Sequence, residues 1–462
     1  MSLMIREIAP HDPLHAHLAL EAVADVLPRH TLEAVIDACG VREQRCRKLP
    51  AMMTLLVCIA MNLFAHEALP HVYRCLVSGL RWLWPAPQAL TVTSSALCQA
   101  RARLGAQPLV VLFHTVCRPL AHTTTPDAFL FGYRLMALDG TTLDLPDTPA
   151  NETAFGRPGS NRGRSAWPQA QVVALAECGT HALCDAGVWR CDASERHAVQ
   201  RLLRSLTAEM LVLWDRGLHS FDLIVQTQAR DAQLLGRLPR NVQPERVQTL
   251  ADGTQLVRLR PSDKARRRAG EQVLVRLIRY TLDDPQRPGH QTEHRLITSL
   301  FDPEQAPAEE LVMAYHQRWE FELGVDELVT HQRPPRPLRS HTPVGVIQEI
   351  YALFLAHYLV RAIMVAAAAP AAVAPTRLSF LTTLRLMREA LPDFQRSAPS
   401  EHPRIAHRLR ADILAAKLPP RANRSNPRVV KRKMSTFRVK TPAHRHWPQP
   451  TKPFRDAIVL RI

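Results

Sequence analysis

The stretch RLMALDGTTLDLPD, residues 134–147, marks the point where the chain changes from a helical to a β pattern. Its first residues form an apolar run that is typical of a strand. Asp139 follows that run, and Gly140 leaves the backbone open to the close approach of another group. We therefore expect a carboxylate on a strand with free space beside it.

An α/β layer is predicted around this strand, because apolar runs of strand length lie before and after a helical stretch. The run at 170–191 reads as a hairpin with its turn near Gly179. Helical periodicity covers 193–206, and another strand follows within 209–217. From about 225 to 300 the period returns to two, which predicts a β-rich antiparallel insertion.

The region before this core, residues 1–128, is predicted to be a helical DNA-binding domain. Apolar positions recur there every three or four residues, and no strand-like alternation occurs. One of its helices is predicted from VTSSALCQARARLG, residues 92–105, and a second helix of about 12 residues follows. The pair resembles a helix-turn-helix.

The first helix of this pair is basic. Ser94 or Ser95 is the expected N-cap, and Gly105 is the expected stop. Arg101 and Arg103 lie along the helix and are candidate DNA contacts. A solvated arginine face on a packing helix is the alternative interpretation.

A strongly helical segment is predicted at 307–332, bounded by prolines, and a helix-rich stretch follows at 344–391. We take 129–396 as one core domain. Residues 397–462 are rich in Pro and Arg and are predicted to form a basic tail.

The charge of the chain points to a polyanionic partner. The 462 residues contain 59 Lys and Arg against 42 Asp and Glu, a net charge of +17. Residues 401–462 hold 16 of the former and 3 of the latter, so +13 lies there and +4 in the rest. Such a tail suits contact with DNA phosphates, with a disordered, solvating tail as the alternative. The candidate contacts are Lys431, Arg432 and Lys433.

Cysteine usage and hydropathy favour a cytoplasmic protein. The nine cysteines are odd in number and show no paired framework, which favours reduced thiols. The first residues lack the basic and apolar pattern of a signal peptide. The most apolar run, 362–374, is short of the roughly 20 residues that span a bilayer.

Two carboxylates follow apolar strands and could carry chemistry. Asp139 and Asp215 both stand at strand positions that a sheet can bring side by side. Paired carboxylates are the hard oxygen ligands that divalent metal ions require. An Asp after a strand also commonly opens a turn, so each residue alone is weak support.

A third carboxylate lies on the helix at 307–332. With an advance of about 100° per residue, Tyr315, Arg318 and Glu322 fall on one stripe. Glu322 could complete a metal shell while Arg318 and Tyr315 hold a phosphate. Asp326, one turn on, is a rival metal ligand, and a solvated helix face is the alternative.

Three stretches taken in order resemble the signature regions of DDE transposases of the insertion-sequence-4 group. They are LDGTTLDLPDTPANETAFGRP around Asp139, LWDRG around Asp215 and YHQRWEFELGVDEL around Glu322. The third matches the family's Y-x2-R-x3-E-x6-K box at Tyr315, Arg318 and Glu322, except that the final Lys position falls on Val329. Most of the chain is covered, since further matches are REQRCRKLPA near residue 42, SSALCQARARLG near 94, LRSHTP near 338 and NPRVVKRKMS near 426.

The resemblance implies an RNase H-like core with a β-rich insertion, and a site in which Asp139, Asp215 and Glu322 hold two Mg²⁺ ions, with Mn²⁺ as a possible substitute. The implied activity is strand cleavage and strand transfer at the terminal inverted repeats of an insertion sequence. The implied partners are double-stranded DNA and a second copy of the chain in a synaptic homodimer. Related enzymes can pass through a DNA hairpin with a flipped base, for which Trp319 is a candidate support; a core tryptophan is the alternative.

Two other functions remain open at this stage. A catalytically impaired, transposase-derived DNA-binding protein is favoured only by Val329, and the three intact carboxylates argue against it. A metal-dependent nuclease that cuts without joining is less favoured, because the box around Glu322 and the β insertion both match the transposase pattern.

Overall fold

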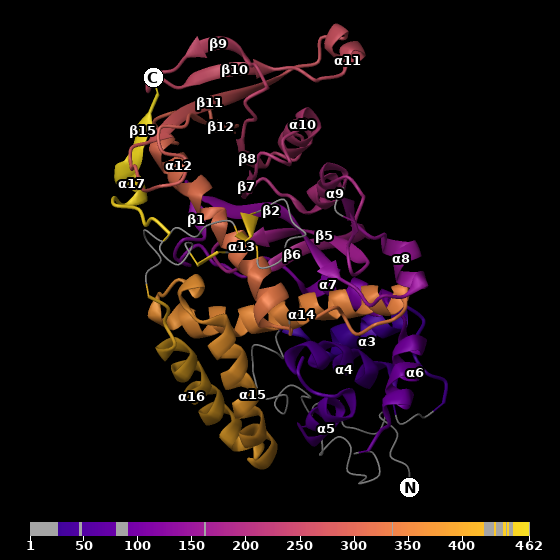
Figure 1. The fold of residues 1–462 in the computed structure, drawn as a ribbon. Helices are drawn as coiled ribbons and strands as arrows, with labels where there is room; N and C mark the ends of the chain where they lie inside the picture. Colours follow the sequence, from indigo (N-terminus) through magenta and orange to yellow (C-terminus); the bar gives the residue numbers. More distant parts are fainter. Residues whose placement is uncertain are drawn as a thin grey trace.

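The computed structural model describes residues 26–45, 49–79, 91–160, 163–334, 336–419, 429–430, 438–439, 441–442 and 447–461. A mixed sheet lies at the centre, an antiparallel extension of that sheet lies at one end, and helices fill the other end (Figure 1). The long helix α14 (Pro343–Ala368) lies between the sheet and the helical end.

The central sheet combines antiparallel and parallel strands. Its order is β6-β5-β2-β7-β8-β12-β11-β10-β9. The central strand β2 pairs antiparallel with β5 on one side and parallel with β7 on the other, and β7 pairs parallel with β8. The five strands of this part are β2 (Tyr133–Asp144), β5 (Gln169–Glu177), β6 (Leu183–Arg190), β7 (Met210–Trp214) and β8 (Gln233–Arg237).

Both faces of this sheet are covered. Along β2, Leu135 and Ala137 join one hydrophobic cluster while Met136 and Leu138 join another, so alternate residues serve opposite faces. This explains the continuous apolar run in the sequence, since a strand that is buried on both sides does not alternate. The first cluster contains α14, and the second contains residues of α9 (Glu195–Leu202) and α10 (Phe221–Gln228).

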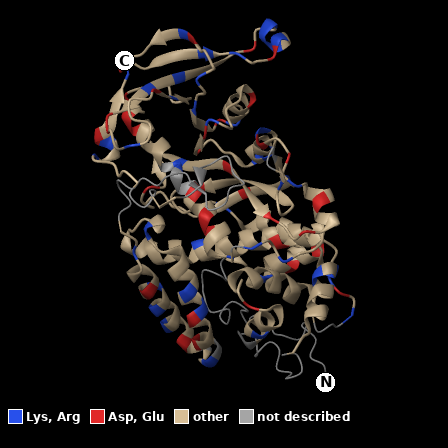
Figure 2. Cartoon of the chain, viewed as in Figure 1, with Lys and Arg blue, Asp and Glu red and all other residues tan. Residues whose placement is uncertain are grey.

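The antiparallel unit predicted near 225–300 is present, but it begins later. Residues 225–237 contribute to α10 and to the parallel strand β8. The antiparallel strands are β9 (Glu245–Thr249), β10 (Gln255–Leu259), β11 (Val273–Leu282) and β12 (His294–Thr298), and β12 joins them to β8. At their tip, α11 (Lys264–Arg268) forms a small basic group that is visible in Figure 2.

The N-terminal region is helical, as predicted. The described residues before Phe129 contain no strand; their helices are α3 (Arg29–Ala38), α4 (Ala51–Leu63), α5 (Leu69–Gly79), α6 (Ser94–Leu104) and α7 (Gln107–Val116). The expected cap of α6 was wrong. Thr93 is the N-cap, because its side chain accepts from the N–H of Ala96, so Ser94 and Ser95 are already inside the helix.

The segment predicted as a tail begins with folded structure. Helix α16 (His402–Ala415) packs with α15 (Phe380–Arg396) and α14 in a separate hydrophobic cluster. The end of the chain returns to the sheet, where β15 (Ile458–Leu460) pairs with β11 and follows α17 (Phe454–Ala457). The remaining elements are β1 (Phe129–Leu130), α8 (Pro149–Phe155), β3 (Gly159–Ser160), β4 (Gly163–Arg164), α12 (Ala308–Gln317), α13 (Trp319–Asp326), β13 (Val429–Val430) and β14 (Arg438–Val439).

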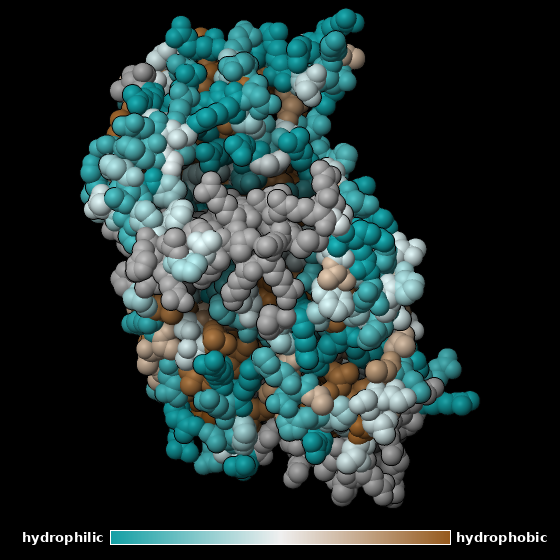
Figure 3. Space-filling model, viewed as in Figure 1, coloured by the Kyte–Doolittle hydropathy of each residue, from teal (hydrophilic) through white to brown (hydrophobic). Residues whose placement is uncertain are grey.

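Helix α14 is also the one helix among the described residues that combines great length with an apolar composition. With its continuation it covers Pro343–Ala371 and is long and apolar enough by composition to cross a membrane, yet 89% of its most apolar window is buried inside the protein. It is therefore the core helix of the fold. Figure 3 shows mostly hydrophilic side chains on the antiparallel end and small hydrophobic groups over the helical end.

Candidate active site

The first carboxylate of the candidate site is Asp139 on β2. It follows the four fully buried residues of the strand and is itself half-buried. Its Oδ1 accepts the N–H of Gly140 at 2.8 Å. Burial raises the pKa of Asp139; the Arg318 charge and the Gly140 N–H oppose that rise, and the negative charge of Asp215 adds to it.

The second carboxylate lies beside the first. Leu138 of β2 is paired with Trp214 of β7, and the two strands are parallel. The next residues, Asp139 and Asp215, therefore meet at the same edge of the sheet. Asp215 also opens a turn, since its Oδ1 accepts the N–H groups of Gly217 and Leu218 at 2.7 and 3.1 Å. The turn interpretation of this Asp is confirmed, while its second oxygen, Oδ2, accepts no hydrogen bond from the described residues.

The third carboxylate is tied to the first by an arginine. Arg318 donates from Nη1 to Asp139 Oδ2 and from Nη2 to Glu322 Oε1, both at 3.0 Å. Its side chain is 12% exposed, so these two ion pairs are largely shielded from water. The guanidinium thus links β2 to α13 and points from the helix toward the sheet.

Tyr315 is a hydrogen-bond partner of this arginine. Burial raises the pKa of its hydroxyl, while the charge of Arg318 and a hydrogen bond with it act in the other direction. The negative charge of Asp215 also raises the pKa of Tyr315. Tyr315, Arg318 and Glu322 therefore share one side, as the stripe predicts, although the helix breaks at Arg318 between α12 and α13.

Two residues of the same segment lie elsewhere. Asp326, the rival metal ligand, is exposed and pairs with His331 at 3.2 Å. Val329 packs against the main hydrophobic cluster. The straight-helix geometry fails here, because α13 ends at Asp326 and a π-helical turn, Glu327–His331, rotates the following residues.

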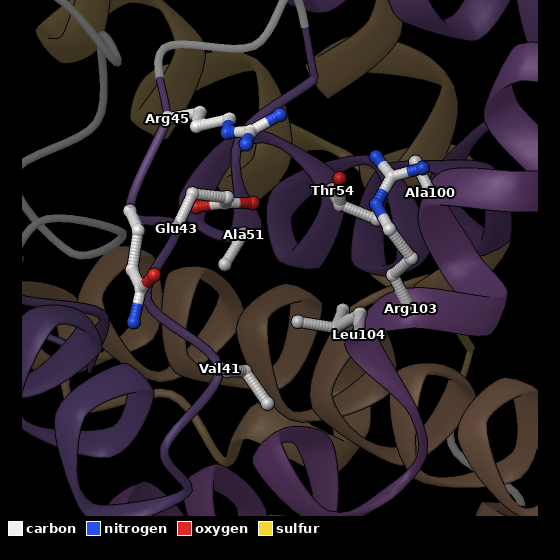
Figure 4. Close-up of a pocket in the computed structure, with 9 residues that line it drawn as sticks. Val41, Glu43, Arg45, Ala51, Thr54, Ala100, Arg103 and Leu104 are labelled. Atoms are coloured by element: carbon white, nitrogen blue, oxygen red, sulfur yellow. The ribbon is translucent and has the colours of Figure 1, made fainter.

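The two arginines of the basic helix α6 have different surroundings. Arg101 donates to Gln348 Oε1 at 2.8 Å and to Ser340 Oγ at 2.9 Å, so it joins α6 to α14 and to the LRSHTP segment. Arg103 is exposed and lines a cavity of about 380 Å³ together with Glu43 and Arg45 (Figure 4). This cavity brings together two of the stretches that resemble the family, those near residues 42 and 94.

Several predicted contacts lie outside the described residues. These are the side chain of Trp319, whose backbone begins α13, and the whole of Lys431, Arg432 and Lys433.

Sequence reasoning missed two charged residues near the Asp pair. Arg237 ends β8, and the pairing of Trp214 with Gly236 brings it next to Asp215. Glu195 begins α9 and lies against Gly140. The space predicted beside Gly140 was a partial signal for the second residue, but nothing local in the sequence says which side chain fills it.

The donor set suits a divalent metal ion of the hard class. Asp139, Asp215 and Glu322 offer only carboxylate oxygens. In the described part of the chain, no three Asp, Glu, His or Cys side chains converge closely enough to hold a metal as they stand. Between Asp139 and Glu322, the Arg318 guanidinium occupies the place of a shared cation and pairs with both carboxylates.

Comparison with known families gives the class of this site. Residues 130–359 match the family Transposase DDE domain, and residues 17–114 match the family Insertion element 4 transposase N-terminal. The protein is a DDE transposase, a class of enzyme that acts on DNA.

Individual relatives give the family. The chain is 30% identical over 447 residues to the transposase InsG for insertion sequence element IS4 of Escherichia coli (strain K12), covering 95% of this chain and 96% of that protein. It is 26% identical over 252 residues to InsZ of the same strain, which is named as a candidate transposase; this covers 52% of the chain and 80% of InsZ. The chain belongs to the IS4 family of DDE transposases.

Proposed function

We propose that this transposase performs cut-and-paste transposition: it cleaves DNA at the terminal inverted repeats of an insertion sequence and joins the freed ends to target DNA. The observation that carries the proposal is the meeting of Asp139 and Asp215 at one sheet edge, with Glu322 tied to them through Arg318. Two strand carboxylates and one helix carboxylate form a donor set suited to phosphoryl transfer.

Asp139, Asp215 and Glu322 are the proposed holders of two Mg²⁺ ions, with Mn²⁺ able to substitute. Bound divalent ions supply Lewis acidity at the phosphorus and lower the pKa of an attacking water or 3′-hydroxyl. Arg318 can exchange a carboxylate for a DNA phosphate, since both present paired oxygens to its forked donors. Tyr315, which hydrogen-bonds to Arg318, is proposed to hold the same phosphate by a single hydrogen bond.

We further propose that the core is RNase H-like. Three features support this: the first Asp is on the central strand β2, the second follows the parallel strand β7, and Glu322 is on a helix after the antiparallel unit.

The proposed DNA contacts outside the site are the basic helix α6 and the C-terminal basic residues. Arg103 is exposed next to Arg45 and suits contact with phosphate. The contacts expected of Arg101, Lys431, Arg432 and Lys433 stay predictions, and for Arg101 the hydrogen bonds to Gln348 and Ser340 compete with DNA. A synaptic homodimer and a hairpin route supported by Trp319 are further parts of the proposal.

One observation favours the second candidate, a DNA-binding protein without catalysis. The family's Lys position is occupied by Val329, which is partly buried and packs against the main hydrophobic cluster. The intact carboxylates weigh against this alternative.

The test is metal-dependent cleavage of a labelled duplex that carries the element's own end. The native protein should nick at the element boundary in Mg²⁺, while Asp139→Ala and Glu322→Ala should bind the duplex equally well and leave it uncut. If all three proteins bind alike and none cuts in Mg²⁺ or Mn²⁺, the proposal fails in favour of the DNA-binding candidate.

A further inference from the structure

Glu195 lies against Gly140, the residue that follows the first carboxylate of the candidate site. It is the first residue of α9, which covers the sheet beside β2 (Figure 1). A Cβ built on Gly140 would overlap the Glu195 Oε1 atom. The Glu195 carboxylate therefore occupies the place of a side chain at position 140, on the face of the sheet that α9 covers.

A carboxylate with a purely structural role usually has a positively charged or hydrogen-bonding partner, and Glu195 has neither among the described residues. Glu195 itself is half-buried. The nearest charges that act on it are those of Asp139 and Asp215; burial and these two charges raise the pKa of Glu195.

The fully buried carboxylates among the described residues all have partners that stabilise their charge, and Glu349, for example, accepts from the Arg339 backbone N–H and the Ser340 hydroxyl. Glu177 pairs with Arg134, Asp185 with Arg204, and Glu327 with Arg361. Glu195 differs from each of these, because the charges that act on it, those of Asp139 and Asp215, have the same sign as its own. Such an arrangement is unfavourable unless a cation joins it.

We propose that Glu195 is a fourth carboxylate of the divalent-metal site, approaching the strand β2 from α9 over Gly140. This inference rests on the proposed function of Asp139, Asp215 and Glu322. The proposal also explains why position 140 is a glycine, because any larger residue there would displace the Glu195 carboxylate from its place over the strand.

The test uses the full-length protein and the metal alone. Binding of MnCl₂ is measured by calorimetry for the native protein, Glu195→Gln, Asp139→Asn and Asp192→Asn. Asp192 is an exposed carboxylate three residues before Glu195, paired with Arg190, and serves as the matched control. We expect Glu195→Gln to weaken Mn²⁺ binding about tenfold and Asp192→Asn to leave it unchanged.

A second readout separates a metal role from a structural one. Without metal, Glu195→Gln removes a like charge from beside two aspartates, so the thermal midpoint should rise or stay the same. With Mn²⁺, the stabilisation of the variant should be smaller than that of the native protein. A residue that merely holds the fold together would lower the metal-free midpoint instead, and that result overturns the proposal.

Gly140 provides an independent route to the same site. Its backbone has no left-handed φ, so Gly140→Ala should fold while pushing the carboxylate of Glu195 aside. Gly140→Ala, Glu195→Ala and the double variant should therefore lose Mn²⁺ affinity to the same extent. Additive losses would contradict the proposal.

The outcomes also separate this inference from the proposed function. If Asp139→Asn loses Mn²⁺ binding and Glu195→Gln does not, the three-carboxylate site stands and the role of Glu195 is refuted. If the native protein and Asp139→Asn bind Mn²⁺ equally or not at all, the proposed metal site itself fails.

Discussion

A buried ionic cluster fixes the helix that carries Glu322, and removing its only acid should be costly. Glu327 begins the π-helical turn directly after α13. Its Oε2 accepts from Arg361 Nε at 2.9 Å, and Arg361 Nη2 pairs with Oε1. His357 and His181 lie at 3.2 and 3.3 Å from the same carboxylate. The cluster joins α13 to α14 and to the β5–β6 turn.

The magnitude follows from burial. Arg361 is 1% exposed and His357 is fully buried, so neither can turn to water when its partner is lost. Burial alone would raise the pKa of Glu327, but Arg361 and His181 hold it well below its usual range. Removing one member of such a pair costs about 3–5 kcal/mol, because an uncompensated buried charge remains. We expect this loss for Glu327→Gln.

The assay is equilibrium unfolding in urea at pH 7, followed by circular dichroism. The matched control is Glu310→Gln, which breaks an exposed pair with Arg455 and should cost at most about 1 kcal/mol. Adding Arg361→Met to Glu327→Gln should recover part of the loss, since the orphaned charge is then gone. If Glu327→Gln costs no more than the control, the cluster does not hold the helix in place.

Three further predictions concern the site and its surroundings. Arg318→Gln should move the acid limb of the cleavage pH profile to higher pH, because Arg318 opposes the rise in the pKa of Asp139 caused by burial; an unchanged limb would contradict the pairing. Burial lowers the pKa of His219 to about 4, so the folded state resists protonation and stability falls as the pH drops from about 6.5 toward 4. Thermal unfolding is compared at pH 7 and pH 5. The free energy of unfolding should fall by about 2 kcal/mol less in His219→Gln than in the native protein, and equal decreases would refute this. Val329→Lys should not increase cleavage of the element end, since position 329 packs against the main hydrophobic cluster; a clear gain in rate would show that the side chain reaches DNA.

The sequence was most informative where local pattern decides structure. The apolar runs predicted β2, β5 and β7. Asp139 and Asp215, which follow the runs of β2 and β7, lie at the same edge of the sheet because these two strands are parallel neighbours. The helical stripe predicted that Tyr315, Arg318 and Glu322 face one way, and the contacts of Arg318 agree with it.

The sequence was least informative where distant segments meet. The π-helical turn after Asp326 is held by Arg361 and His181, both far away along the chain, and Val329 on this turn packs against the main hydrophobic cluster. Glu195 approaches Gly140 across 55 positions of sequence. The chain beyond 397 was read from composition alone, although the apolar side of α16 packs against α14 and α15.

The central claim is that Asp139, Asp215 and Glu322 form one divalent-metal site, and the most direct test is a crystal structure of the full-length protein in MnCl₂ at a concentration that supports cleavage. Anomalous scattering would locate the metal. The account predicts Mn²⁺ between Asp139 and Asp215, with Arg318 withdrawn from at least one of its two carboxylates. Mn²⁺ bound away from both aspartates, or Arg318 still bridging Asp139 and Glu322 in an active crystal, would contradict it.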